Sequence, residues 1–159
     1  MKPEEVTLRP VQPADEAFLL QVYACTRAAE MAMVPWSAEQ KAAFVRMQFE
    51  AQLRHYRAQY PGAEHSIIQH QGRDVGRLYL DRAPEHIHIL DVTVLPEHRG
   101  AGLGTLLLRR LMEEGARARL PLSIYVESFN PSQRLFARLG FRKQKEEGIH
   151  WLLQWMPAD

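Results

Sequence analysis

An arginine and three glycines at alternate positions form the most distinctive pattern in the sequence, Arg99-Gly100-Ala101-Gly102-Leu103-Gly104-Thr105. A strand-like segment precedes them and a helix-like segment follows. Glycine has no Cβ, so its backbone can adopt positive φ and approach a ligand closely. The first N–H groups of a helix have no partner within the helix, and the helix dipole favours negative charge there. The pattern predicts that the amides of residues 99–105 hold a pyrophosphate. The glycines alone leave open a tight turn in which they serve packing only.

Residues that could move a proton lie on the strand-like segment over residues 86–95. This segment contains His86, His88 and Asp91. Histidine titrates near neutral pH without help from its surroundings. Asp91 interrupts an apolar run and therefore needs a partner or access to solvent. We expect Asp91 and His88 to be the catalytic residues, and Glu127, at the end of a later strand, is a further candidate. The alternatives are solvated strand positions for the histidines and a structural hydrogen bond for Asp91.

The composition is that of an ordinary globular protein, and it excludes several classes. The chain has 159 residues, of which 46% are apolar, and its 20 basic and 19 acidic residues give a net charge of +1. This balance gives no reason to expect nucleic acid or a membrane as partner, and no apolar run approaches the ~20 residues of a membrane span. The single cysteine, Cys25, excludes an internal disulfide and a cysteine-cluster metal site. Residues 1–5 lack the apolar core of a signal peptide. We therefore expect one cytoplasmic domain over residues 1–159, without a metal.

Apolar spacing divides the chain into the helices and strands that must position these residues. Ser37 with Gln40 is a capping-box signal, and Asn130-Pro131 has the pattern of an N-cap followed by the first helical residue. Turns are expected over 71–74, 82–85 and 146–148. A period near 3.6 predicts helices over 13–32, 37–60, 103–119 and 130–139, and a period of two predicts strands over 6–9, 65–70, 75–81, 86–95, 122–127, 141–145 and 149–156.

The order of these elements predicts an α+β fold. The consecutive strands between residues 65 and 95 should form an antiparallel meander. The helix after the glycine-rich turn should lead by a right-handed crossover to a parallel strand, which places the 122–127 strand beside the 86–95 strand. The expected architecture is a mixed, mainly antiparallel sheet with helices on both faces.

Two motifs in this arrangement resemble the GCN5-related N-acetyltransferase (GNAT) superfamily. The glycine-rich turn, with Val94-x-Pro96 before it, is similar to the family's Arg/Gln-x-x-Gly-x-Gly/Ala signature. The second motif is Asn130-Pro131-Ser132-Gln133-Arg134-Leu135-Phe136-Ala137-Arg138-Leu139-Gly140-Phe141. It resembles the family's segment in which an asparagine is followed by a short helix and then by Leu-Gly-Phe. The resemblance is most specific over residues 86–142. The order of the elements also agrees with the acyl-CoA N-acyltransferase (GNAT) fold.

The resemblance implies acetyl-CoA as the acyl donor. In this family the two parallel strands splay apart and leave a slot for the pantetheine arm. Backbone groups of Val92 to Val94 are expected to pair with that arm, and an N–H near Val94 is expected to polarise the thioester carbonyl. Asn130 is expected at the mouth of the slot, where it contacts the cofactor, caps its helix, or does both. The residues expected at the cofactor are Val92, Thr93, Val94, Arg99, Gly100, Ala101, Gly102, Leu103, Gly104, Thr105, Asn130 and Phe136.

Phe136 departs from the family pattern, because many members have a tyrosine there that protonates the leaving thiolate. The resemblance implies an N-acetyltransferase in which a primary amine of a small molecule or peptide attacks the thioester directly. The phenylalanine leaves open a second function, an acyl-CoA-binding sensor or partner subunit with little or no catalysis. The link over residues 30–36 is a candidate wall of the acceptor pocket. The acceptor itself cannot be inferred from this sequence.

The last predicted strand has an alternating apolar pattern, formed by Ile149, Trp151, Leu153 and Trp155. An alternating strand of this kind either completes the core of its own chain or pairs with a second chain. A homodimer is therefore possible.

Overall fold

The computed structural model describes residues 5–158. Residues 1–4 and 159 lie outside the described range. The two ends of the expected 1–159 domain, and most of the 1–5 segment that was compared with a signal peptide, therefore lie outside the described residues. No helix in the described range is long and apolar enough to cross a membrane. The elements follow in the order β1 (Val6–Pro10), a 3-10 turn (Pro13–Asp15), α1 (Glu16–Ala32), α2 (Ala38–Gln59), β2 (Glu64–His70), β3 (Arg73–Arg82), β4 (Ile87–Val94), a 3-10 turn (Pro96–His98), α3 (Leu103–Ala118), β5 (Leu122–Glu127), α4 (Gln133–Arg138), β6 (Arg142–Glu147) and β7 (His150–Trp155).

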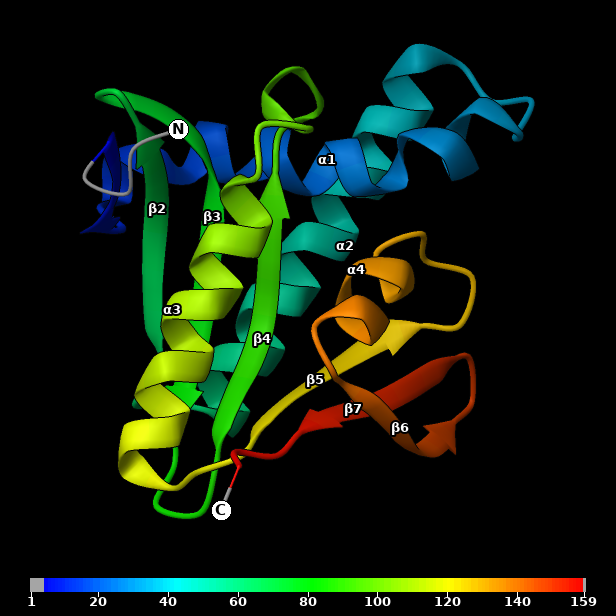
Figure 1. Ribbon diagram of the computed structural model, residues 1–159. Coiled ribbons are helices and arrows are strands. Elements are labelled where there is room, and N and C mark those ends of the chain that lie inside the picture. Colours follow the sequence, from blue (N-terminus) through cyan, green and yellow to red (C-terminus); the bar gives the residue numbers. More distant parts are fainter. Residues whose placement is uncertain (1–4, 159) are drawn as a thin grey trace.

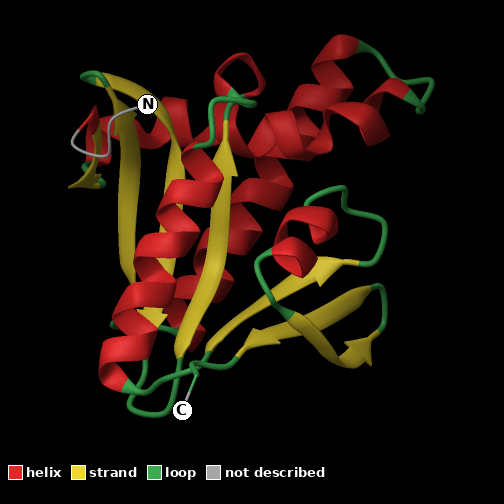
Figure 2. Cartoon of the chain, viewed as in Figure 1, coloured by secondary structure: helices red, strands yellow, loops and turns green. Residues whose placement is uncertain are grey.

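Within residues 5–158, seven strands form one mixed sheet in the order β1-β2-β3-β4-β5-β7-β6 (Figures 1 and 2). Neighbouring strands are antiparallel except β4 and β5, which are parallel and are connected through α3. Helices α1 and α2 cover one face of the sheet, and α3 and α4 cover the other (Figure 1). This architecture confirms the predicted α+β fold, including the antiparallel meander and the parallel crossover.

Apolar clusters lie on both faces of the sheet, and β4 contributes to each. Ile87 and Ile89 pack into the cluster beneath α3, whose leucines recur at helical spacing on one side of the helix. Leu90 packs instead into the cluster beneath α1 and α2, which also contains Phe49 and Tyr79. The central strand is therefore buried from both sides.

A β-bulge in β4 changes the face to which its side chains point. Strand β3 pairs with β4 through Tyr79–Asp91 and Leu80–Ile89, so Leu90 is an extra residue in the register. Side chains along a strand alternate between faces, and one extra residue shifts that alternation. Ile89 lies beneath α3, whereas Leu90 and Asp91 both face α2. Without the bulge, the alternation would place Asp91 among the apolar side chains beneath α3.

Strands β4 and β5 separate soon after they begin. Beyond residue 89 of β4, the pairing with β5 ends, and the two strands diverge toward their C-terminal ends, as Figure 1 shows. The edge of β4 that faces β5 therefore has no strand partner beyond this point within residues 5–158. This is the splayed slot that the family resemblance implies. The residue pairs that join the two strands are Ile87–Leu122, His88–Ser123 and Ile89–Ile124.

Local signals explain where several elements begin. Ser37 and Gln40 form the predicted capping box, in which the Gln40 N–H donates to Ser37 Oγ at 3.1 Å and the Ser37 N–H donates to Gln40 Oε1 at 2.9 Å. The turn between β2 and β3 is shorter than predicted. It consists of Gln71 and Gly72, with φ of 53° and 78°, and such a two-residue turn matches the twist of the flanking strands. Strand β3 consequently begins at Arg73.

Two predictions near the C-terminus are wrong. Helix α4 begins at Gln133, because the Asn130 side chain closes a turn of its own: its Oδ1 accepts the Ser132 N–H at 2.9 Å. The turn between β6 and β7 includes Ile149, which is exposed, so β7 begins at His150. The capping role and the strand position predicted for Asn130 and Ile149 are corrected accordingly.

The position of β7 excludes it as a strand that pairs with a second chain. It lies between β5 and β6 inside the sheet, and Leu153 is part of the core. The edge on this side is β6, whose residues are all exposed and mostly charged. Charged side chains on an edge strand oppose pairing with another chain.

Candidate active site

The glycine-rich turn forms an open cradle at the start of α3. Gly100 and Gly102 have φ of 83° and 81°, in the left-handed region that favours glycine. Gly104 lies in the first turn of α3 without a positive φ, and a Cβ at this position would meet only Leu135 Cδ2, at 3.8 Å. The backbone therefore requires two of the three glycines. No contact with residues 5–158 requires the third.

Free amides accompany the space at Gly104. The Leu106 N–H donates to the Gly102 carbonyl at 2.9 Å, which is the first bond of the α3 ladder. The amides of Leu103, Gly104 and Thr105 precede that bond and have no partner within the helix. Together with the positive end of the helix dipole, they can bind an anion.

The Arg99 side chain turns back from the cradle toward β4 and α1. Its Nε donates to the Val94 carbonyl at 3.0 Å, and its Nη2 lies 3.6 Å from Cys25 Sγ. Burial raises the pKa of the Cys25 thiol, so this contact is not a thiolate ion pair at neutral pH. In this arrangement the guanidinium contacts the end of β4 and α1, and it does not bond to the amides at the start of α3.

Beside the cradle, β4 presents its backbone to the slot. The side chains of Val92 and Val94 pack against the cluster beneath α3, and Thr93 is buried on the opposite face. The side chains of this segment therefore point above and below the sheet. The strand edge between them offers N–H and C=O groups to whatever enters the slot, although the Val94 carbonyl already accepts from Arg99 Nε.

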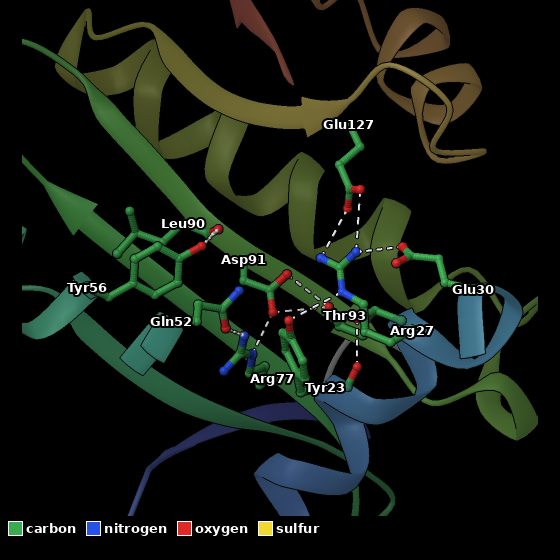
Figure 3. A network of polar contacts seen from close by, with 11 residues as sticks. Tyr23, Arg27, Glu30, Gln52, Tyr56, Arg77, Leu90, Asp91, Thr93 and Glu127 are labelled. Carbon is green, nitrogen blue, oxygen red and sulfur yellow. Dashed lines mark hydrogen bonds and ion pairs between the residues drawn. The ribbon is translucent and has the colours of Figure 1, made fainter. Parts of the chain in front are cut away.

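Asp91 is held by two neighbours on the face covered by α2 (Figure 3). Arg77 Nε donates to Asp91 Oδ2 at 2.5 Å, and the Thr93 hydroxyl donates to the same carboxylate, 2.9 Å from Oδ1 and 3.1 Å from Oδ2. Arg77 also donates from Nη2 to Gln52 Oε1 in α2, at 2.5 Å. The Asp91 side chain is 24% exposed and that of Arg77 only 1%. The structural hydrogen bond considered for Asp91 is thus present, and its carboxylate still reaches solvent.

A second arginine links α1 to the C-terminal end of β5 (Figure 3). Arg27 lies over the ring of Tyr23 and donates to its hydroxyl at 3.3 Å. It also donates to Glu30 Oε1 at 2.7 Å and lies 3.2 Å from Glu127 Oε1. The Glu127 carboxylate, which the sequence offers as a possible base, is therefore engaged in an ion pair.

His88 lies at the closed end of the slot, where β4 and β5 still pair. Its side chain is buried, and Nδ1 lies 2.8 Å from Ser123 Oγ. The rings of Tyr60 and Tyr125 have centroids 5.8 and 5.7 Å from that of His88. Burial lowers the pKa of His88 below its usual value, so the imidazole is neutral at neutral pH. The alternative of a solvated strand position does not hold for this histidine.

In the second motif, Asn130 lies in the loop that leaves β5 and Phe136 lies in α4, which follows that loop. Asn130 donates its N–H to the Glu127 carbonyl at 2.9 Å, and its side-chain oxygen is occupied by Ser132, as described above. Phe136 is buried in α4, with its ring 5.2 Å from that of Phe141. No proton donor occupies the position of Phe136.

The sequence does not identify two members of the Asp91 network, Arg77 and Gln52. A signal was available for Arg77, which interrupts an apolar strand just as Asp91 does. Gln52 gives no such signal, because a polar residue in a helix is most often solvated. Among residues 5–158, no group of three or more side chains is arranged to hold a metal ion.

Comparisons with known proteins agree with this geometry. The model of the acetyltransferase (GNAT) family matches residues 26–141. The solved structure of a PaiA N-acetyltransferase from Thermoplasma acidophilum in complex with coenzyme A is 18% identical, with a TM-score of 0.70 over 95% of this chain and 98% of that one. A GCN5-related N-acetyltransferase from Rhodopseudomonas palustris is 24% identical, with a TM-score of 0.68 over 98% of each chain. A GNAT acetyltransferase from Elizabethkingia anophelis with acetyl-CoA bound is 16% identical, with a TM-score of 0.61 over 96% and 99%. No curated protein matches the sequence.

The structural similarities show the shared fold, and the family match extends over most of the chain. It begins within α1, includes the bulged strand, the cradle and the splayed pair, and ends just after α4. The chain therefore belongs to the GNAT acetyltransferase family.

Proposed function

We propose that the protein is an N-acetyltransferase that moves an acetyl group from acetyl-CoA to a primary amine of a small molecule or peptide. The observation that carries this proposal is the space at Gly104 in front of the free amides of α3. A glycine within a helix costs up to about 1 kcal/mol relative to alanine. A pyrophosphate held by the amides of residues 103–105 accounts for that cost. The coenzyme A in one similar structure and the acetyl-CoA in another support this donor.

The open edge of β4 supports the position of the pantetheine arm. An extended chain with amide groups can pair with an exposed strand edge as an additional strand does. In this arrangement the backbone of Val92 to Val94 holds the arm, and the thioester lies deeper in the slot, toward the bulge. A backbone N–H of the same edge then polarises the thioester carbonyl.

The acceptor enters from the face covered by α1 and α2, where Asp91 and His88 both lie. Its ammonium first loses a proton to a base, for which neutral His88 and the Asp91 carboxylate are the candidates. The amine lone pair then attacks the thioester carbon and forms the C–N bond. The C–S bond breaks, and its electron pair stays on sulfur. The nitrogen loses a second proton and becomes the amide.

The thiolate takes up one proton to complete the reaction, so one proton is released overall for each acetyl group moved from an ammonium acceptor. Phe136 cannot supply that proton. We propose that this proton comes from water or from the nitrogen of the acceptor. A thiolate is a good leaving group and needs protonation only after it departs.

The buried Phe136 also favours a second function, a protein that binds acyl-CoA without efficient catalysis. Calorimetric titration with acetyl-CoA, followed by thiol release assays over a panel of amines, separates the two. The proposed function predicts saturable binding and amine-dependent release of coenzyme A. Binding without release for any amine would support the non-catalytic function, and an absence of binding would contradict both.

Asp91→Asn tests the catalytic assignment. The amide keeps the size of the side chain but removes its negative charge, and loss of a single acid–base group costs about 10²–10⁴-fold in rate. We expect kcat/KM for the amine to fall at least 100-fold, with the Kd for acetyl-CoA within a factor of two of wild type. Equal activity of the variant would return Asp91 to a structural role.

A further inference from the structure

Arg77 is an unusual residue to find at this depth in the fold. Its side chain is 1% exposed, and its Nη1 has no hydrogen-bond partner within residues 5–158. A buried cation is costly unless its partners compensate for lost hydration, and a buried ion pair is often no more stable than apolar residues of the same volume. Stability of the fold therefore does not explain why β3 carries an arginine here.

The arrangement around Arg77 is asymmetric. The guanidinium is enclosed by the sheet and α2, and Gln52 supports it from the helix. The carboxylate of Asp91 lies in front of it and keeps access to solvent. The bulge at Leu90 is what brings the carboxylate to this face, opposite an arginine on the neighbouring strand. An incoming ligand can reach Asp91 but not Arg77.

The bonds to Asp91 leave part of the carboxylate available. Arg77 occupies Oδ2, and the single hydroxyl hydrogen of Thr93 is shared between the two oxygens. Each carboxylate oxygen has two lone pairs. Oδ1 therefore retains one for a further donor, with its direction fixed by the other two bonds.

The charges of the surrounding network are suited to a cationic donor. The network includes the guanidinium groups of Arg27 and Arg77 and the carboxylates of Glu30, Asp91 and Glu127 (Figure 3). Among these bonded groups, Arg27 is paired with Glu30 and Glu127, and Arg77 is paired with Asp91. Asp91 is the carboxylate beside the free edge of β4, so an ammonium group that enters the slot meets a negative partner there.

We propose that Arg77 is a positioning residue for acceptor binding: it fixes the Asp91 carboxylate so that Oδ1 receives the ammonium group of the acceptor next to the slot. The proposal rests on the proposed function, because it assumes an amine acceptor. Beyond the proposed function, it identifies Arg77 as the residue that orients Asp91 and gives a reason for the burial of Arg77. It also makes Asp91 the first contact of the amine.

The test is a double-mutant cycle with Arg77→Met, Asp91→Asn and the double variant. We expect Arg77→Met to raise KM for the amine or lower its kcat/KM at least tenfold, with the Kd for acetyl-CoA within twofold of wild type. Arg77→Lys should recover part of the loss, because it restores the charge with fewer donors. In the Asp91→Asn background the same Arg77→Met change should alter kcat/KM less than twofold.

Arg82→Met is the control, since Arg82 ends the same strand, is paired with Glu64 and Glu114, and lies opposite Ile87, where β4 and β5 still pair. It should leave the acceptor parameters unchanged. Additive effects of the Arg77 and Asp91 changes, or a parallel loss of acetyl-CoA affinity, would show that Arg77 acts through the fold. If Arg77→Met does not fold, Gln52→Leu replaces it in the cycle, because it removes only the support of the guanidinium from α2.

A crystal structure of Arg77→Met or, in the second case, Gln52→Leu, gives a result that does not depend on turnover. The proposal predicts a reoriented Asp91 side chain, and an unchanged orientation overturns it. Failure of the proposed function would give a different result: the wild-type protein would release no coenzyme A with any amine.

Discussion

Gly104→Ala separates the role of the cradle in folding from its role in ligand binding. A Cβ at this position meets only Leu135 Cδ2 at 3.8 Å, and the helical backbone accepts alanine without strain. Alanine is favoured over glycine within a helix by up to about 1 kcal/mol, and near the helix end we expect about half of that. For a chain of this size, 1 kcal/mol corresponds to a change in Tm of about 2–4 °C. Without ligand, the variant should melt about 1–2 °C above wild type.

The effect on ligand binding should have the opposite sign. Coenzyme A at 100 times its Kd stabilises wild type by about 2.7 kcal/mol, or roughly 5–10 °C. If the Cβ displaces the pyrophosphate and weakens binding 100-fold, the same concentration stabilises the variant by only about 0.4 kcal/mol. The assay is thermal unfolding with and without coenzyme A, with calorimetric Kd values as a second measure.

The two measurements refute different parts of the reasoning. An undiminished rise in Tm with coenzyme A would show that the phosphate does not lie against Gly104. A fall in Tm without ligand would show that the fold itself requires this glycine. Gly102→Ala is less informative, because its φ of 81° makes any side chain costly in the absence of ligand.

Two further predictions concern stability. Gly76→Ala should lower the free energy of unfolding by more than about 2 kcal/mol in urea titrations, because its Cβ would lie 2.1 Å from the Thr93 carbonyl oxygen. The control is Gly62→Ala, whose Cβ meets nothing within 4 Å and which should change the free energy of unfolding by less than about 0.5 kcal/mol. A loss for Gly76→Ala as small as that for Gly62→Ala would mean that β3 and β4 separate freely. Burial lowers the pKa of His65, whose ring stacks on Tyr79, from 6.5 to about 4. Between these two pH values the unfolded chain binds more protons than the folded protein. The contribution of neutral His65 to stability is therefore complete above pH 6.5 and declines as the pH falls toward 4. His65→Phe should flatten this decline in unfolding experiments at pH 7 and pH 4.5, and an unchanged slope would assign it to other groups.

The fold could be predicted from the sequence because its signals are local. The strand period, the capping box at Ser37 and the glycines at positions 100 and 102 each specify their own backbone. The sequence pattern does not give the start of α4, because Asn130 can cap either a helix or a turn, and in both its side-chain oxygen accepts a backbone N–H. Local pattern does not distinguish these outcomes.

The candidate site could be predicted only in part, because its polar groups are brought together by strand register. Asp91 can be predicted as a site residue because it is a charged residue within an apolar run. Arg77 carries the same signal, but pairing the two requires the register of β3 on β4, including the extra residue Leu90. Nothing in the sequence around Leu90 specifies a bulge, since no glycine marks it. The face on which Asp91 lies is therefore a property of the assembled sheet.

The short pairing between β4 and β5 has a consequence for how the protein opens. Only three residue pairs join the strand ladders of the two halves of the sheet in the described chain, so amides at this boundary should exchange with solvent through local openings that cost less than global unfolding. A donor molecule bound along the free edge of β4 would close those openings. Hydrogen exchange at Ile87 and Ile89, whose amides face β5, would then slow on addition of coenzyme A, and the degree of slowing would measure the affinity for the donor.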